Sequence, residues 1–309
     1  MRILILVLTL AIGLPALSAG DARSYYREFQ SQNRRLEMKK LRYLEAVVRG
    51  TDIRRITRYR EMVVEQLSDS RNELSRVGGF EGDSTLWKEY MRAFDLYEQA
   101  FVEGFKDAEG LIKTRYANYD SLKAYYAILT EAEITMLDAA YVIEEAEKYF
   151  GKIHRVEVAV NEENRSKMNQ LNVLSVHTRE VGLAFYRVRA AVSGFIEATQ
   201  SEEHAATDTL MTLVREIQKS TALSRQDQKA MNEFEEDDLS DFLSYYLDEM
   251  EEVIEDLREL AGKLGNKFLE EDAYEEAQKE LAKFVDWQEE ELSDYRETQN
   301  ALVDDFLEE

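Results

Sequence analysis

The stretch DLSDFLSYYLDEMEEVIEDLRELAGKL, residues 238–264, carries apolar side chains at alternating steps of four and three residues. This spacing places them along one side of an α-helix, where they can pack against neighbouring helices. The stripe consists of Leu239, Leu243, Tyr246, Met250, Val253, Leu257, Leu260 and Leu264. The stretch therefore predicts a long amphipathic helix.

Similar stripes recur along the chain, separated by glycines or short polar segments. Gly50 and Gly78-Gly79 mark two helix ends, because glycine commonly ends helices. Asn118 begins a predicted turn, and residues 221–228 are expected to connect two helices. The expected helices lie at about 25–48, 52–77, 84–108, 122–160, 168–195, 210–217, 239–264 and 274–306.

The only proline of the chain is Pro15, and long uninterrupted helices suit a chain without further prolines. The chain contains a weak internal repeat: FEGD at 80–83 precedes Leu86 and Tyr90, and FEED at 234–237 precedes Leu239 and Leu243. Two amphipathic helices can also align in this way by chance. The sequence predicts an all-α fold, an elongated antiparallel helical bundle of two tandem four-helix units, residues 21–160 and 161–309. An aromatic stripe is expected in the core rather than around a ligand: Tyr90, Tyr97, Phe101 and Phe105.

Residues 1–20 have the three parts of a secretory signal peptide. A basic start at Arg2 precedes an apolar run from Ile3 to Leu14, and small residues from Ala16 follow for cleavage. An uncleaved anchor is the alternative, but a membrane span needs about 20 apolar residues. We therefore expect an exported protein, in the periplasm or at the cell surface, with no transmembrane span after signal cleavage.

Charge and cysteine content narrow the class of protein. The chain has no cysteine, which excludes disulfides, thiolate metal sites and a lipid-anchored cysteine. The net charge is −24, and residues 233–309 alone carry 29 acidic and 6 basic side chains. Such a chain repels nucleic acid, so nucleic acid is not an expected partner.

The first part of the chain is basic, with 14 basic and 9 acidic residues from 21 to 80. This segment could pair with the acidic last quarter, within one molecule or between two molecules. Arg34, Arg35, Lys39 and Lys40 are the candidate interaction residues. Alternatively, both segments are solvated helix faces that serve solubility.

The three histidines are His154, His177 and His204. His177 and Glu180 stand three residues apart, so on a helix they could offer a nitrogen and a carboxylate to one metal ion. Exported helical proteins of the imelysin type carry a G-x-H-x-x-E motif, whereas Ser175 stands at the glycine position here. In so acidic a chain, such a pair also arises by chance, and no cofactor is expected.

The common catalytic motifs are missing from the sequence. No cysteine nucleophile is available, and neither a G-x-S-x-G turn nor a glycine-rich phosphate loop occurs. Carboxylates are too numerous for any pair to stand out. The sequence therefore predicts that the protein is not an enzyme.

The stretch Phe80-Glu81-Gly82-Asp83, followed by Leu86, Tyr90 and Tyr97, resembles an uncharacterised family of exported, mostly helical bacterial surface proteins. In that family an F-x-G-D stretch precedes a long amphipathic helix, and a second similar unit follows. Glu236 replaces the glycine in the second copy of this chain. The resemblance implies a signal peptide and a helical mature region, and it supplies no site residue.

Taken together, these features predict a non-enzymatic envelope or surface protein that acts through protein–protein interaction, as a scaffold or adaptor. Its expected partner is another envelope protein or a second copy of itself. The alternative is a periplasmic helical bundle that binds a metal ion or small ligand, with His177 and Glu180 as the metal ligands. A sensor ectodomain ranks last, because no second apolar span follows to carry a signal.

Overall fold

The computed structural model describes residues 19–159, 162–201, 205–231 and 238–308. The predicted signal peptide lies outside this part except for Ala19 and Gly20, and His204 lies outside it too. No described helix combines the length and apolar composition that crossing a membrane requires.

The described chain is helical throughout its regular structure, so the predicted all-α bundle is confirmed. The first half contains α1 (Ala19–Val48), α2 (Ile53–Val77), α3 (Thr85–Glu98), the π-helical turn η1 (Gln99–Gly104), α4 (Phe105–Leu111) and α5 (Tyr119–His154). The second half contains α6 (Glu162–Gln200), α7 (Thr207–Ala230), α8 (Asp238–Glu252), α9 (Ile254–Leu264) and α10 (Glu271–Glu308).

Several helix ends follow the predicted punctuation. The Asp52 side chain caps α2 by accepting a hydrogen bond from the backbone N–H of Arg54 at 2.8 Å. Asn118, where a turn was predicted, instead caps α5 directly, accepting from the N–H of Ser121 at 2.8 Å, and the helix begins at Tyr119 rather than near 122. Gly78 follows α2 with a φ of 67°, a backbone conformation that glycine adopts without a steric cost.

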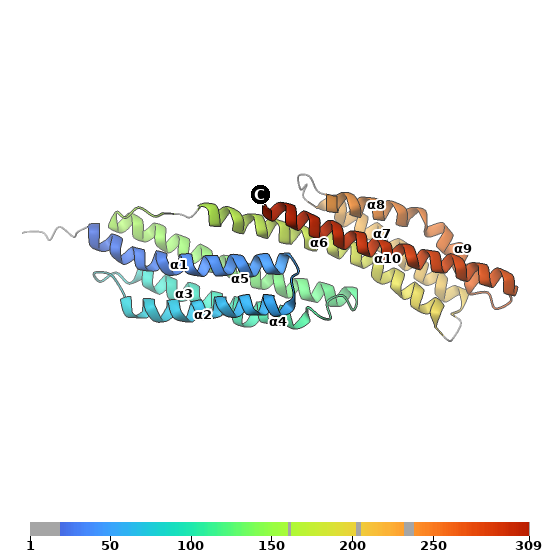
Figure 1. Cartoon of the computed structure of the whole chain (residues 1–309), viewed down its shortest axis with the longest axis horizontal. Coiled ribbons are helices and arrows are strands. Elements are labelled where there is room, and N and C mark those ends of the chain that lie inside the picture. The colour runs from blue at the N-terminus through green and yellow to red at the C-terminus, as the bar shows by residue number, and fades with distance from the viewer. Residues whose placement is uncertain (1–18, 160–161, 202–204, 232–237, 309) are drawn as a thin grey trace, which may run out of the picture.

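Two hydrophobic cores lie end to end along the molecule (Figure 1). In the first core, Phe29 and Tyr90 pack edge to face with ring centroids 5.0 Å apart. In the second core, Phe185 stacks on Tyr295 at 4.4 Å. The four aromatic residues predicted to be core are all buried: Tyr90, Tyr97, Phe101 and Phe105.

Helix α6 belongs to both cores. Leu171 near its start is part of the first core, and Leu174, one turn later, is part of the second. The predicted boundary between residues 160 and 161 therefore lies just before a helix that spans the junction, and the division into two domains there stays a prediction.

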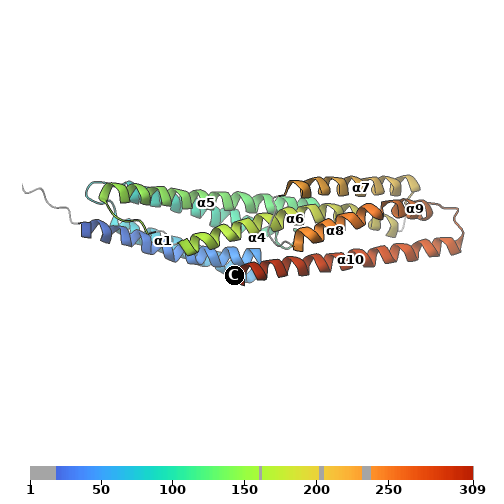
Figure 2. The same cartoon turned by 90° about the horizontal axis from the view of Figure 1, so that it is seen from above.

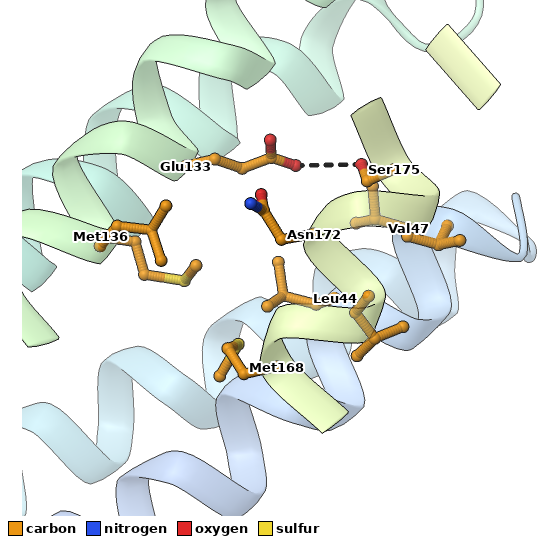
Figure 3. Close-up of a pocket in the computed structure, with 10 residues that line it drawn as sticks. Leu44, Val47, Glu133, Met136, Met168, Asn172 and Ser175 are labelled. Carbon is orange, nitrogen blue, oxygen red and sulfur yellow. Dashed lines mark hydrogen bonds between the residues drawn. The ribbon is translucent and has the colours of Figure 1, made fainter. Parts of the chain in front are cut away.

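Figure 3 shows where α6 lies against α1 and α5, around a cavity of about 10 Å³. Ser175 on α6 donates a hydrogen bond to Glu133 on α5 across 3.3 Å. Leu44, Met136 and Met168 line the same cavity. Such a volume holds at most about one water molecule, so this cavity is a packing detail of the junction.

The structure corrects four details of the predicted helices. Residues 221–228 continue α7 and are not a connection, with Thr221 and Ser224 buried in its packed face. The third helix passes through the π-helical turn η1, where a side chain on Gly104 would approach Ala132 of α5 within 2.7 Å. The fourth predicted helix, expected to reach residue 160, ends as α5 at His154, because Arg155 adopts a left-handed conformation with a φ of 54°. Val253 interrupts the helix expected from 239 to 264.

Candidate functional site

Two hollows lie between α8–α9 and α10 in the second bundle, where these helices run side by side (Figure 2). One hollow of about 580 Å³ lies near the start of α8, and another of about 600 Å³ lies beside α9. We call the two hollows and the seam between them the acidic groove. Its size, its charge and its apolar floor make it the candidate site.

The floor of the acidic groove is apolar. Leu257 and Leu260 from α9 are buried beneath it. Phe284 and Trp287 from α10 are half-buried, with ring centroids 5.7 Å apart. The half-buried rings leave apolar surface that a partner could cover.

The rims of the acidic groove are mostly carboxylates. Lys263 reaches across it, with its Nζ atom 3.1 Å from Glu259 and 3.2 Å from Glu280. This lysine ties α9 to α10, and its single positive charge offsets one of the negative charges on the rim at that point. Lys283 also lines the hollow beside α9. The other acidic side chains lining the hollows are Asp238, Asp241, Glu249, Asp256 and Glu297.

Glu291 lies on α10 beside the seam and is only 5% exposed. Its Oε1 atom accepts a hydrogen bond from the Trp287 indole at 2.8 Å, and its Oε2 atom has no hydrogen-bond partner among the described residues. Burial raises the pKa of Glu291, and the neighbouring carboxylates of Asp294 and Glu249 raise it further. Carboxylates thus crowd around this part of the seam, and both this crowding and burial disfavour the charged form of Glu291.

The exposed Tyr245 on α8 is affected by the same carboxylates. The charge of Glu249 raises the pKa of the Tyr245 phenol, and burial and the charge of Glu291 add to this effect. Tyr245 is 53% exposed, so its ring is available to a partner. An apolar floor between acidic rims can hold a segment that is apolar on one side and cationic on the other.

The two predicted metal ligands, His177 and Glu180, are not joined by a third ligand among the described residues. His177 on α6 is buried at 4% exposure, whereas Glu180 is exposed. Within the described ranges, no three or more histidine, aspartate or glutamate side chains are placed to hold a metal ion. Metal binding at His177 and Glu180 stays a prediction without further support. His154, the other described histidine of an H-x-x-E pair, lies with its Nε2 atom 3.3 Å from Asp83.

The predicted basic patch is divided by the fold. Arg34 and Arg35 are exposed and Lys39 is half-buried, but Lys40 is only 3% exposed and cannot serve a surface. The Lys40 amine donates a hydrogen bond to the Tyr97 hydroxyl at 2.6 Å. Burial lowers the pKa of Lys40 to about 8, against a smaller opposing effect of Glu37. Lys40 is buried because it follows Leu36 by one helical turn and shares its inward side.

Phe284 and Trp287 lie within the helix expected at 274–306, and the sequence assigns Trp287 no role. A tryptophan within so acidic a stretch was the available signal, since aromatic anchors are enriched at interfaces. The half-burial of both rings depends on how closely α9 approaches α10, which only the tertiary structure determines. Comparison of the chain with protein-family models, with curated proteins and with solved structures finds no match.

Proposed function

We propose that this chain is a non-enzymatic, exported envelope or surface protein, a scaffold or adaptor that works through protein–protein contact. In this proposal, the acidic groove receives a cationic amphipathic helix from a partner protein. The observation that carries the proposal is the apolar floor of Leu257, Phe284 and Trp287 between rims of carboxylates.

Physical complementarity favours this occupant. An amphipathic helix lays its apolar side into a groove, and lysines or arginines on its flanks would meet the rims. Rim carboxylates such as Asp241, Glu249 and Asp256 supply negative charge that attracts such a segment over a distance of about 10 Å at moderate salt.

A second copy of this chain is another source of basic residues. Arg34 and Arg35 are exposed on α1, which belongs to the first bundle, whereas α9 belongs to the second (Figure 1). Within the molecule, an ion pair from Arg49 to Asp304 joins the ends of α1 and α10 and uses neither of these arginines. The exposed arginines could therefore meet another molecule, and self-association is a distinct outcome of the test below. The metal-binding alternative at His177 has no comparable support, since Glu180 points to solvent while His177 is buried.

Trp287 provides a direct measure of occupancy. In a Trp87→Phe background it is the single tryptophan, and its fluorescence reports the groove. The probe is a synthetic lysine–leucine amphipathic peptide of about 18 residues, roughly 27 Å long as a helix. We expect saturable binding that weakens with added salt.

Two matched variants test where the probe binds. The groove variant is Asp241→Asn with Glu249→Gln and Asp256→Asn, and it should bind about tenfold more weakly, since each rim ion pair contributes about 0.2–1 kcal/mol. The control variant removes the same charge from α6 and α7, at Glu197, Asp208 and Glu216, and should bind like the parent. If both variants bind the peptide equally weakly, binding depends only on the net charge of the protein, and the acidic groove is not the binding site. A dimer that dissociates only in the groove variant would identify a second copy as the occupant.

A photoreactive residue at Tyr245 extends the test to the cell, because this exposed side chain lies in the groove. We expect a crosslink to a defined envelope protein through a basic helix. Crosslinks that map to acidic or uncharged segments would contradict the proposed partner chemistry, and recovery of the tagged chain only from the cytoplasm would contradict the proposed export.

A further inference from the structure

A second cavity lies at the junction of the two bundles, away from the acidic groove. It has a volume of about 220 Å³ and is built from the end of α1, the segment between α4 and α5, and helices α5, α6 and α10. We call it the junction pocket. Its lining thus comes from segments that are far apart in the sequence and from both cores.

The junction pocket is basic in a strongly acidic protein. Its lining includes four arginines, Arg49, Arg115, Arg179 and Arg296, and none of its described lining residues is an aspartate or glutamate. The net charge of the whole chain is −24. Solubility alone does not explain arginines that line a cavity, so the arrangement calls for a ligand of opposite charge.

Two of the four arginines are already neutralised. Arg179 pairs with Glu133 at 2.5 Å, and both side chains are 8% exposed. Arg49 pairs with Glu45 at 3.2 Å and also with Asp304. These pairs hold the walls of the pocket in place and leave little charge for a ligand.

The other two arginines have no such partner. Among the described residues, no aspartate or glutamate forms an ion pair with Arg115 or Arg296, and their guanidinium groups interact instead with tyrosine hydroxyls, Arg115 with Tyr116 and Arg296 with Tyr186. The Nε atom of Arg115 is buried and has no hydrogen-bond partner within the described part of the chain, which is costly for a charged group. The Arg115 guanidinium lies over the rings of Tyr116 at 4.7 Å and Tyr125 at 5.3 Å, which fix its position.

The remaining lining can hold the rest of a small polar molecule. Tyr116, Tyr125 and Tyr126 supply aromatic faces and hydroxyl groups. Gln299 and Asn300 on α10 add amide groups that donate and accept hydrogen bonds. Pockets of this kind combine a few polar groups with flat apolar walls that orient a ligand.

We infer that the junction pocket is a binding site for a small dianionic oxyanion, a phosphate monoester or a dicarboxylate, held by Arg115 and Arg296. Arginine matches such groups because its planar guanidinium donates two parallel hydrogen bonds to phosphate or carboxylate oxygens. Two arginines without a carboxylate partner match two negative charges. The volume of about 220 Å³ limits the ligand to a small molecule.

This inference does not depend on the acidic groove, which has the opposite charge. A ligand in the junction pocket would contact α1, α5, α6 and α10 at once, so its binding would stabilise the arrangement of the two bundles. The two sites can therefore be tested separately in the same protein.

The test uses the whole chain without its first twenty residues and four probes: inorganic phosphate, glycerol 3-phosphate, succinate and malate. Calorimetric titration and thermal unfolding are followed at constant ionic strength, with acetate and chloride as monovalent references. We expect at least one dianion to bind saturably and to raise the unfolding temperature. Preference for the two phosphates or the two carboxylates then identifies the class of ligand.

The variants Arg115→Gln and Arg296→Gln should each weaken binding about tenfold or more, as expected when a charge-assisted hydrogen bond is lost. A control variant, Arg34→Gln with Arg35→Gln, removes two exposed arginines elsewhere and should leave binding unchanged. If Arg115→Gln does not fold, Arg296→Gln decides, because the Arg296 side chain is exposed. Absence of binding by all four dianions, or binding that survives loss of both arginines, would overturn the inference.

Discussion

Arg179 on α6 forms a 2.5 Å ion pair with Glu133 on α5, and both side chains are 8% exposed. The guanidinium also donates to the Thr130 hydroxyl at 2.8 Å and to the Ser175 carbonyl at 2.8 Å. The pair lies at the level where α6 passes from the first core to the second. It therefore fixes the register of α6 against α5 at the junction of the bundles.

Removing one partner of this pair should be costly. Arg179→Met leaves the Glu133 carboxylate buried without its countercharge, and we expect a loss of about 3–5 kcal/mol in unfolding free energy. Replacing both residues by methionine should recover most of that loss, because no buried charge remains. Urea unfolding followed by circular dichroism measures both. A single variant as stable as Lys167→Met, an exposed control, would contradict a role for the pair.

Lys40 predicts a particular dependence of stability on pH. Its pKa is about 8 in the folded protein and ordinarily 10.5, because burial disfavours the charged amine. Below pH 8 both states bind the proton, and the folded state carries the full cost of the buried charge. Between pH 8 and 10 the unfolded chain binds more protons, so the contribution of Lys40 to stability rises with pH.

The double variant Lys40→Met with Tyr97→Phe removes the buried charge and its hydrogen-bond partner together. We expect it to be more stable than the parent at pH 7 by about 1–3 kcal/mol. The gain should shrink as the pH approaches 10. Denaturant unfolding at several pH values measures the difference, and a gain that is constant from pH 7 to 10 would refute the lowered pKa.

Gly265 allows α9 to end closely against the start of α7. A Cβ atom at this position would lie 2.4 Å from the Cα atom and 2.6 Å from the backbone nitrogen of Thr207. Because backbone atoms cannot move aside cheaply, Gly265→Ala should destabilise the protein by about 1–3 kcal/mol. A Cβ atom on Gly110 in α4 would meet no other atom within 4 Å, so Gly110→Ala should stabilise by about 0.5–1 kcal/mol. Thermal unfolding of the two variants should give shifts of opposite sign.

The exposed part of the basic patch can be tested without disturbing the core. Reversing Arg34, Arg35 and Lys39 to glutamate while keeping Lys40 should change assembly or partner binding, because the variant removes the basic character of this side of α1. Its thermal stability should stay within the small range expected for surface changes. Sedimentation and crosslinking would follow assembly, and unchanged behaviour in both would exclude this patch as an interaction surface.

The helices and most of their ends were predictable from the sequence because their signals are local. Asp52 and Asn118 cap helices through hydrogen bonds to residues two or three positions away, and Gly78 ends α2 by its own conformation. The failures came from longer-range effects. Residues 221–228 have weak apolar spacing, but Thr221 and Ser224 still pack inside the bundle, where Ser224 donates to the Ala184 carbonyl at 2.7 Å.

The candidate sites were less predictable. The acidic last quarter and the basic first segment were evident from composition, but Lys40 proved to lie in the core and the half-burial of Trp287 could not be foreseen. The junction pocket left no local signal at all, since Arg115 and Arg296 are 181 positions apart in the sequence. Each arginine alone resembles any surface arginine.

The sequence by itself determined an all-α chain, the period of its apolar stripes, several caps and the distribution of charge, because these depend on residues within a few positions of one another. Only the tertiary structure decided that α6 spans two cores, that α9 and α10 leave an acidic groove, and that Arg115 and Arg296 line one pocket. These features arise from the packing of helices distant in sequence, which depends on side-chain shape and on contacts that no local pattern specifies.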